Sequence, residues 1–374
     1  MKKSFLVIGI LSTMISITSC KTKEKEVMEF PDESEIESTV LEKKDKEDKE
    51  IEEVEKPKEI EDEHIGQSRD VITGSWINED VASRRPIAVM INNHNKALPQ
   101  SGIGQAGIIY EVPVEGGINR LMAVFHDFNS DKIGPVRSAR HYFLDLASDH
   151  DAIYVHYGKS PQALKAFDVL NAPHLEGLSY LDNIMCWRDN TRFAPHNVYT
   201  NYDKLFKAWE TVGYRKEVKE DFTSKFSFSE DQIECDNVEE FINNIRVKYS
   251  YYQTSTFEYN KKTYMYKRFQ FGKPHIDANT NEQLEFKNII IQYTNVYNIP
   301  NDSAGRLDMN LVSSGKGLYI TNGNVQDITW KKNSYSEPTL LYDSKNEQLK
   351  INKGKTWYMI VPNEIKVELN YKGE

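Results

Sequence analysis

The chain has 374 residues and a formal net charge of −10, and almost all of that charge is local. Residues 21–70 contain 20 Asp and Glu against 10 Lys and Arg, while the remainder is nearly neutral. A nucleic-acid binder would show a basic face and a high pI, so this composition argues against a nucleic-acid partner. The length predicts two folded domains beyond the N-terminal segment.

The N-terminus has the pattern of a lipoprotein signal peptide. Lys2 and Lys3 precede an apolar stretch, residues 5–17, that is too short to span a bilayer, and residues 17–20 read Ile-Thr-Ser-Cys. Cleavage after residue 19 and acylation of Cys20, with palmitate for example, would hold the protein on the outer face of the cell membrane. An ordinary secretory signal that happens to end beside a cysteine is the alternative.

Residues 20–70 are predicted to be a disordered, charged tether, because they carry too few core-forming side chains to offset chain entropy. A local helix in its Glu/Lys run is the alternative, and either form spaces the folded domains from the lipid. After Cys20 only Cys186 and Cys235 remain. Two cysteines without a framework spacing leave open whether they form a disulfide.

Residues 71–225 are predicted to form a layered α/β domain. In chain order we expect strands at 87–92, 108–114 and 121–127, a helix at 138–150, a strand at 152–157, and a helix from Ser160-Pro161, where a hydroxyl cap precedes proline. The order strand, helix, strand, helix favours a right-handed βαβ crossover in which strands 121–127 and 152–157 are parallel neighbours.

Residues 226–374 are predicted to form a mostly β domain. Aromatic and polar residues alternate on both sides of Asn260-Lys261-Lys262, which indicates a hairpin, and short strands divided by Gly, Asn, Asp and Pro follow.

The strand connectivity places a candidate ligand site in the first of these domains. Loops after strands 121–127 and 152–157 would leave the same sheet edge and enter helix N-termini, where open α/β sheets bind ligands. Arg137, Ser138, Arg140 and Ser160 would supply donors for an anion or a densely oxygenated ligand. In the alternative, Ser160 is only a helix cap and the arginines pair with nearby aspartates.

Glu111 and Glu115 do not form an obvious pair of catalytic carboxyl groups. Glu111 and Glu115 would lie on one strand face about 13 Å apart, whereas paired glycosidase carboxyl groups lie about 5 to 9.5 Å apart. Pro113 between them suggests an edge strand. Glu115, beside Gly116-Gly117, is the candidate for a single acid/base, with a solvated strand carboxylate as the alternative.

The loop 186–197 is rich in polar donors, so Arg192, His196 and Asn197 are either ligand contacts or loop-closing groups. The chain has no His-Glu-x-x-His motif and no Cys/His grid, so neither a metal nor a cofactor is expected. The complete set of candidate ligand-binding residues is Glu111, Arg120, Arg137, Ser138, Arg140, His156, Ser160, Arg192, His196 and Asn197.

Several strings together resemble a known family: RPIAVMINN, YEVPVEGGINRLMAVF, IGPVRSARHYFLDLA, DAIYVHYGKSPQA and RFAPHNVYTN, with GKPHID, GLYITNG and KGKTWYMIVP further on. They are similar to the YerB-type lipoproteins of Gram-positive bacteria, whose two domains are classed as domains of unknown function. The likeness covers about residues 75–365. One departure is Lys159, where a second glycine is expected. The resemblance implies a lipoprotein with two domains, and it implies no reaction.

Location, tether and a donor-rich cleft favour an envelope lipoprotein that binds cell-wall glycan or peptide, or a wall-associated partner protein. The alternative is an enzyme that cleaves a cell-wall polymer with Glu115 as acid/base.

Overall fold

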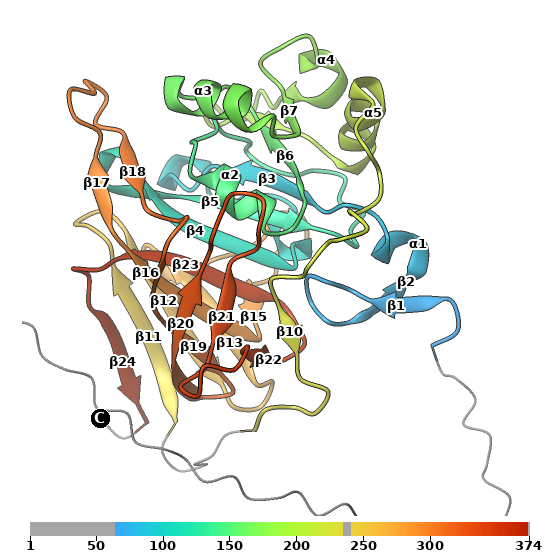
Figure 1. Cartoon of the computed structure of the whole chain (residues 1–374). Helices are drawn as coiled ribbons and strands as arrows, with labels where there is room; N and C mark the ends of the chain where they lie inside the picture. Colours follow the sequence, from blue (N-terminus) through green and yellow to red (C-terminus); the bar gives the residue numbers. More distant parts are fainter. Residues whose placement is uncertain (1–63, 235–240, 373–374) are drawn as a thin grey trace, which may run out of the picture. The chain divides into compact units, whose positions relative to one another are not determined.

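The computed structural model describes residues 64–234 and 241–372 (Figure 1). The predicted signal peptide, Cys20, most of the predicted tether and Cys235 lie outside the described residues. In the part that the structure describes, no helix is long and apolar enough to cross a bilayer.

A ten-stranded sheet is the centre of the fold, and both halves of the chain contribute to it. Its parallel core joins β23, from the C-terminal half, directly to β4, from the N-terminal half. The two predicted sequence domains therefore share one sheet. In spatial order the strands are β21 (Leu340–Tyr342), β20 (Asn324–Lys331), β19 (Ser314–Thr321), β16 (Asn288–Thr294), β23 (Thr356–Pro362), β4 (Ile108–Val114), β5 (Ile118–Phe125), β3 (Ile87–Ile91), β6 (Ile153–His156) and β7 (His174–Glu176).

Strand directions place most carboxyl ends on one edge of this sheet. β3, β6 and β7 are mutually parallel, as are β4, β23 and β16, and β5 runs antiparallel between β4 and β3. The expectation that the strands at 121–127 and 152–157 are parallel neighbours was wrong, because β3 lies between β5 and β6. The βαβ unit is instead β6, α3 (Pro161–Leu170) and β7.

A second sheet covers part of one face of the ten-stranded sheet. It consists of β11 (Ile242–Lys248), β12 (Thr254–Asn260), β13 (Met265–Gln270), β14 (Lys273–Pro274), β15 (Glu285–Phe286) and β24 (Val367–Tyr371). β12 and β13 pair antiparallel and bury alternate residues, which confirms the predicted hairpin. Among the described residues from 241 onward there is no helix, so this half is mostly β as predicted.

The helices complete both hydrophobic layers. α2 (Phe143–Ser148) and α3 pack on one face of the central sheet, whereas α4 (Asp182–Met185) and α5 (Tyr202–Val212) pack on the face that the second sheet also covers. α2 is shorter than the predicted helix 138–150, because Ala139 pairs with Lys159 in an extended conformation. Ser160 caps α3 as predicted, accepting from the Ala163 N–H at 3.1 Å.

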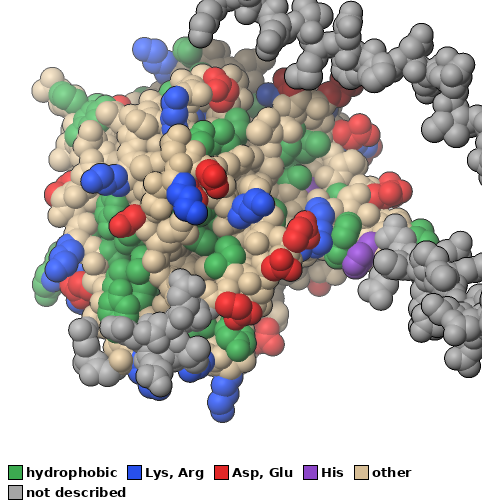
Figure 2. Space-filling view, turned by 60° about the horizontal axis from the view of Figure 1, so that its bottom comes forward, with side chains coloured by type: hydrophobic (Ala, Val, Ile, Leu, Met, Phe, Trp, Pro, Cys, Tyr) green, Lys and Arg blue, Asp and Glu red, His purple; other side chains and the backbone are tan. Residues whose placement is uncertain are grey.

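Short elements border these layers: α1 (Glu79–Ala82) and the strand pairs β1 (Gln67–Arg69) with β2 (Trp76–Asn78), β8 (Trp187–Arg188) with β9 (Val198–Tyr199), β10 (Ser227–Phe228) with β22 (Lys350–Ile351), and β17 (Val296–Asn298) with β18 (Leu307–Met309). On the face shown in Figure 2, charged side chains of both signs are interspersed. That distribution agrees with the nearly neutral composition of the folded residues.

Candidate ligand-binding site

Several of the predicted site residues meet at the carboxyl edge of the central sheet. Glu115 lies in the turn between β4 and β5, and Arg120 lies on β5. The segment after β5 then runs back along this edge, where the Arg137 N–H donates to the Met90 carbonyl at 2.9 Å. The predicted residues thus lie together, but not because β5 and β6 are parallel neighbours. The segment that returns after β5 brings Arg137 and Arg140 to the end of β6.

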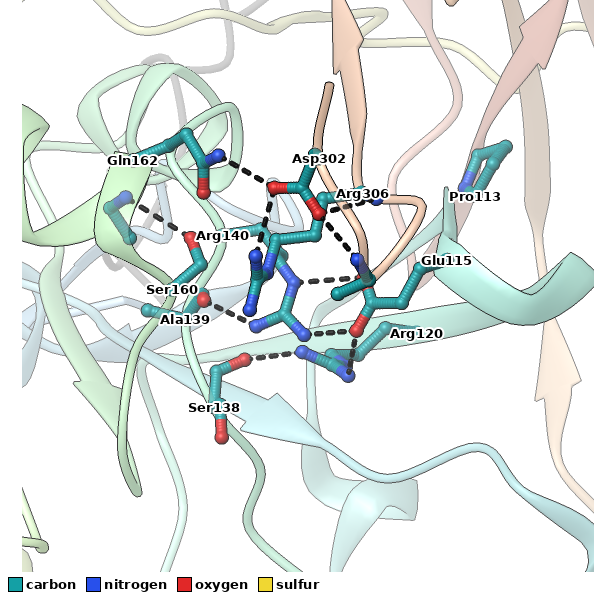
Figure 3. A network of polar contacts seen from close by, with 12 residues as sticks. Pro113, Glu115, Arg120, Ser138, Ala139, Arg140, Ser160, Gln162, Asp302 and Arg306 are labelled. Atoms are coloured by element: carbon teal, nitrogen blue, oxygen red, sulfur yellow. Dashed lines mark hydrogen bonds and ion pairs between the residues drawn. The ribbon is translucent and has the colours of Figure 1, made fainter. Parts of the chain in front are cut away.

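Glu115 is the anion around which two arginines gather (Figure 3). Arg140 binds its carboxylate through two nitrogens, with Nε 2.9 Å from Oε2, and a guanidinium nitrogen of Arg120 lies 3.7 Å from Oε1. Arg120 also donates to the Ser138 carbonyl at 2.6 Å. We call Arg120, Arg137 and Arg140 the arginine cluster.

The charges around Glu115 decide its protonation state. Burial alone would raise its pKa, but hydrogen bonds and charge from Arg140, with the charge of Arg120, outweigh burial and lower the pKa to about 2. Burial lowers the pKa of Arg120 to about 10, so both groups are charged at neutral pH. A carboxylate held in this way has no proton to donate and is a weak base, which suits poorly a general acid/base role.

Arg137 differs from its neighbours because it makes no ion pair within the described residues. Its side chain is half-buried and donates to the Pro195 carbonyl at 3.3 Å. Burial and the charge of Arg140 lower its pKa. A half-buried guanidinium with one neutral acceptor retains donors for a ligand.

A hairpin from the C-terminal half forms one wall of the site. In its loop, Asp302 accepts from Gln162 of α3 at 3.0 Å and from Arg306 at 2.8 Å, above Arg140 in Figure 3. Arg306 pairs with Asp302, so Glu115 is the one carboxylate that the described residues pair with the arginine cluster. The three guanidinium groups and this carboxylate therefore carry a net charge of +2.

His196 lies next to Pro195, whose carbonyl accepts from Arg137, and so borders the arginine cluster. Its ring stacks on His94 with centroids 4.9 Å apart, and its Nδ1 lies 2.8 Å from Asn92 Nδ2. Burial lowers the pKa of His196, and the charges of His94 and Arg137 lower it further. A lowered pKa leaves the His196 ring neutral at neutral pH, so it neither adds to nor compensates the charge of the arginine cluster.

The other residues of loop 186–197 mostly close the loop. Arg192 donates to the carbonyls of Ala97 and Pro99, and Asn197 accepts from Arg188 at 2.9 Å. Within the described residues Cys186 is buried, which raises its pKa to about 12, so its thiol is a poor nucleophile.

Glu111 is enclosed in the core and does not reach this edge. It accepts hydrogen bonds from Asn119 at 2.9 Å and Trp357 at 3.0 Å, and it pairs with Arg268 at 3.3 Å, with both side chains of the ion pair fully buried. Ser255 of the second sheet also donates to it. Glu111 thus links the N-terminal strands to the C-terminal half.

Three further candidates have structural partners. His156 is fully buried against Phe167, and burial lowers its pKa to about 3. Ser160 is the α3 cap, and the Ser138 hydroxyl donates to the Tyr157 carbonyl at 3.0 Å. Lys159, where a glycine was expected, pairs with Glu176. These bonds occupy the groups in local structure.

A pocket of about 280 Å³ adjoins Glu115. Residues of both halves line it: Pro113–Asn119, Tyr249, Val296, Asn298, Gly305, Leu307, Pro362, Glu364 and Ile365. Sequence reasoning did not include its C-terminal walls, because no local pattern connects residues so far apart.

A larger cavity of about 780 Å³ lies at the opposite, amino edge of the parallel strands, near Gly107 and Lys355. Its two buried carboxylates are already engaged in contacts within the chain. Asp277 accepts from the N–H groups of Gly102 and Gly104, and Asp70 lies 2.7 Å from His126. We therefore place the candidate site at the carboxyl edge.

Comparison with known proteins gives a consistent picture. Residues 72–215 match the family model described as "Protein of unknown function (DUF3048) N-terminal domain", and residues 245–358 match its C-terminal domain. A Bacillus subtilis (strain 168) protein named "Putative lipoprotein YerB" is 37% identical over 295 residues, which cover 78% of this chain and 85% of that protein. The crystal structure of the YerB protein from Bacillus subtilis superposes with a TM-score of 0.71 at 34% identity, covering 80% of this chain and 99% of that one.

Proposed function

The chain belongs to the DUF3048 family, and we propose that it is an envelope lipoprotein that binds anionic cell-wall material, glycan or peptide, at the carboxyl edge of its central sheet. Three neighbouring arginines carry this proposal, because the one carboxylate among them, Glu115, pairs with Arg120 and Arg140 alone. Arg137, which lacks an ion pair among the described residues, is the group that we expect to meet the ligand.

Anchoring rests on the sequence of the N-terminus. Cys20 follows an apolar stretch and small residues, and the name of the similar Bacillus subtilis protein includes the word lipoprotein. Acylation by more than one chain gives stable attachment, whereas one chain alone is marginal. The charged segment up to residue 70 would then let the folded part reach wall polymer away from the lipid surface.

The chemistry of the site favours an oxyanion. Guanidinium groups bind carboxylate or phosphate through paired hydrogen bonds, and these charge-assisted bonds are the strong ones. Gathering like charges is unfavourable unless a counter-charge is present, and Glu115 neutralises only one guanidinium. A ligand carboxylate or phosphate would supply the negative charge that the arginine cluster lacks.

The enzymatic alternative has less support. A general acid at neutral pH needs a raised pKa, whereas Glu115 has a pKa of about 2 because Arg140 and Arg120 outweigh the effect of burial. Its neighbours are arranged to keep it ionised, which is the arrangement of a structural anchor for the arginine cluster.

The test is retention by purified sacculi of the mature chain, with Cys20→Ser to keep it soluble. We expect retention without release of wall fragments, and a loss of about tenfold or more in affinity for Arg137→Ala, since a hydrogen bond to a charged group contributes about 1.5–3 kcal/mol. Arg246→Ala is the matched control, because Arg246 forms an exposed pair with Glu368. Equal retention of both variants, or fragments released by the wild type and not by Glu115→Gln, would contradict the proposal.

A further inference from the structure

Two consecutive tyrosines next to the site, Tyr251 and Tyr252, have solvent-exposed side chains. Tyr251 is 89% exposed and Tyr252 is 68% exposed, and their rings meet edge to face with centroids 5.2 Å apart. They lie in the turn between β11 and β12. Two consecutive exposed aromatic rings contribute little to a core and mark a binding surface more often than solitary exposed residues do.

The turn that carries these rings is fixed in place by Ser250. Its hydroxyl donates to the Gly117 carbonyl at 2.6 Å and accepts from the N–H groups of Tyr252 and Gln253, each at 3.0 Å. Gly117 belongs to the same short turn as Glu115. The tyrosine pair is therefore joined directly to the backbone that presents the arginine cluster's carboxylate, and its position is set before any ligand arrives.

The pocket beside this turn has a mixed lining. Pro113, Val296 and Leu307 give it apolar walls, while Glu115 and Asn298 supply polar atoms. Its volume of about 280 Å³ admits one small ring and not a drug-sized molecule. The hairpin wall is held by the bonds of Asp302 to Gln162 and Arg306, so contacts within the chain fix this wall of the pocket.

From this geometry we infer that the Glu115 pocket and the Tyr251–Tyr252 pair form a saccharide subsite that takes a pyranose ring of a glycan chain. A pyranose presents apolar C–H faces and a rim of hydroxyl groups. Aromatic rings can pack against the C–H faces, and carboxylate and amide groups at the pocket can form hydrogen bonds with the hydroxyl groups. Tyrosine loses little conformational entropy on contact, which favours it in such a surface.

This subsite deepens the proposed function and rests on it, because the glycan would be the polymer whose acidic substituents reach the arginine cluster. The two contacts are chemically different. The pocket recognises a neutral ring, while Arg137 recognises an anion, so a neutral oligosaccharide probes the first without the second.

The experiment is calorimetric titration of the mature chain with a neutral tetramer of β-1,4-linked N-acetylglucosamine. We expect binding by the wild type and a loss of about tenfold or more for the double variant Tyr251→Ala/Tyr252→Ala. Tyr180→Ala is the matched control, because Tyr180 is 74% exposed and lies between β7 and α4, outside the turns that carry Glu115 and Tyr251–Tyr252. Arg137→Ala should bind the neutral tetramer as the wild type does.

Absence of tetramer binding by the wild type, or equal binding by the double variant, would overturn the saccharide subsite. Binding of the protein to wall-associated proteins, with no binding to the tetramer, would overturn it as well. If Arg137→Ala still reduces retention on sacculi in that case, the proposed function stands without the subsite. If the tetramer binds as expected but Arg137→Ala is retained on sacculi as well as the wild type, the proposed anion site is contradicted and the saccharide subsite stands.

Discussion

Breaking the buried ion pair of Glu111 and Arg268 should destabilise both halves of the protein together. Arg268 on β13 is fully buried and pairs with Glu111 of β4 at 3.3 Å, and its guanidinium also lies 4.8 Å from the Trp357 ring centroid. Arg268→Met would leave the carboxylate of Glu111 buried without its cation. Removing one partner of a buried pair costs about 3–5 kcal/mol.

Thermal and urea unfolding of the mature chain would measure this loss. Because one sheet contains strands of both halves, we expect a single cooperative transition that moves down by about 10 °C, at about 2–4 °C per kcal/mol for a protein of this size. Glu111→Gln with Arg268→Met should recover part of the loss, since the uncompensated charge is then absent. Arg246→Met breaks an exposed pair and should cost about 0–1 kcal/mol. A loss below about 1 kcal/mol for Arg268→Met, or two separate transitions, would refute this reasoning.

Three further outcomes can be checked independently. Cys20→Ala should move the protein from membranes to the supernatant or leave it as precursor, and a processed variant that stays on membranes would refute acylation at Cys20. Glu115→Gln should be less stable than the wild type at pH 7. The difference in unfolding free energy should narrow as pH falls from about 5 toward 2, because a lowered folded-state pKa gives stability that is lost on protonation. A difference that does not change with pH in urea unfolding would contradict this. Tyr249→Phe should keep its stability, because the Tyr249 hydroxyl is buried without a hydrogen-bond partner among the described residues; a melting temperature several degrees lower would show an unseen partner.

Local sequence patterns predicted the elements whose stability is local. The Ser160-Pro161 cap and the period of α3, the buried strand β3, and the hairpin of β12 and β13 all follow from side-chain spacing and turn residues. In α3 and the β12–β13 hairpin the deciding contacts are local, so the pattern and the cause coincide. β3 was recognisable because both of its faces are buried, although its partners β5 and β6 lie far along the chain.

Pairing between distant strands was not predictable in this way. β4 pairs with β23 across about 250 residues, and nothing in either strand specifies the other. Pro113 suggested an edge strand, yet β4 is central. The proline is tolerated because the β23 pairing ends at Glu111, which leaves Pro113 with a partner on the β5 side alone.

The site shows the same division. The donor-rich string Arg137 to Arg140 identified the arginine cluster, because charged side chains in a loop are visible in sequence. Burial is not visible in this way, so Glu111 and His156 were grouped with exposed candidates although both are enclosed. The Asp302 loop was missed because tertiary contact alone brings it to α3.

The most direct test of anion recognition is calorimetric titration of the mature chain with an acidic cell-wall fragment and with the same fragment after its carboxylates are amidated. We predict that the acidic fragment binds, that amidation weakens binding about tenfold or more, and that Arg137→Ala removes this discrimination. Equal affinity for both fragments, or discrimination that survives Arg137→Ala, would contradict the account.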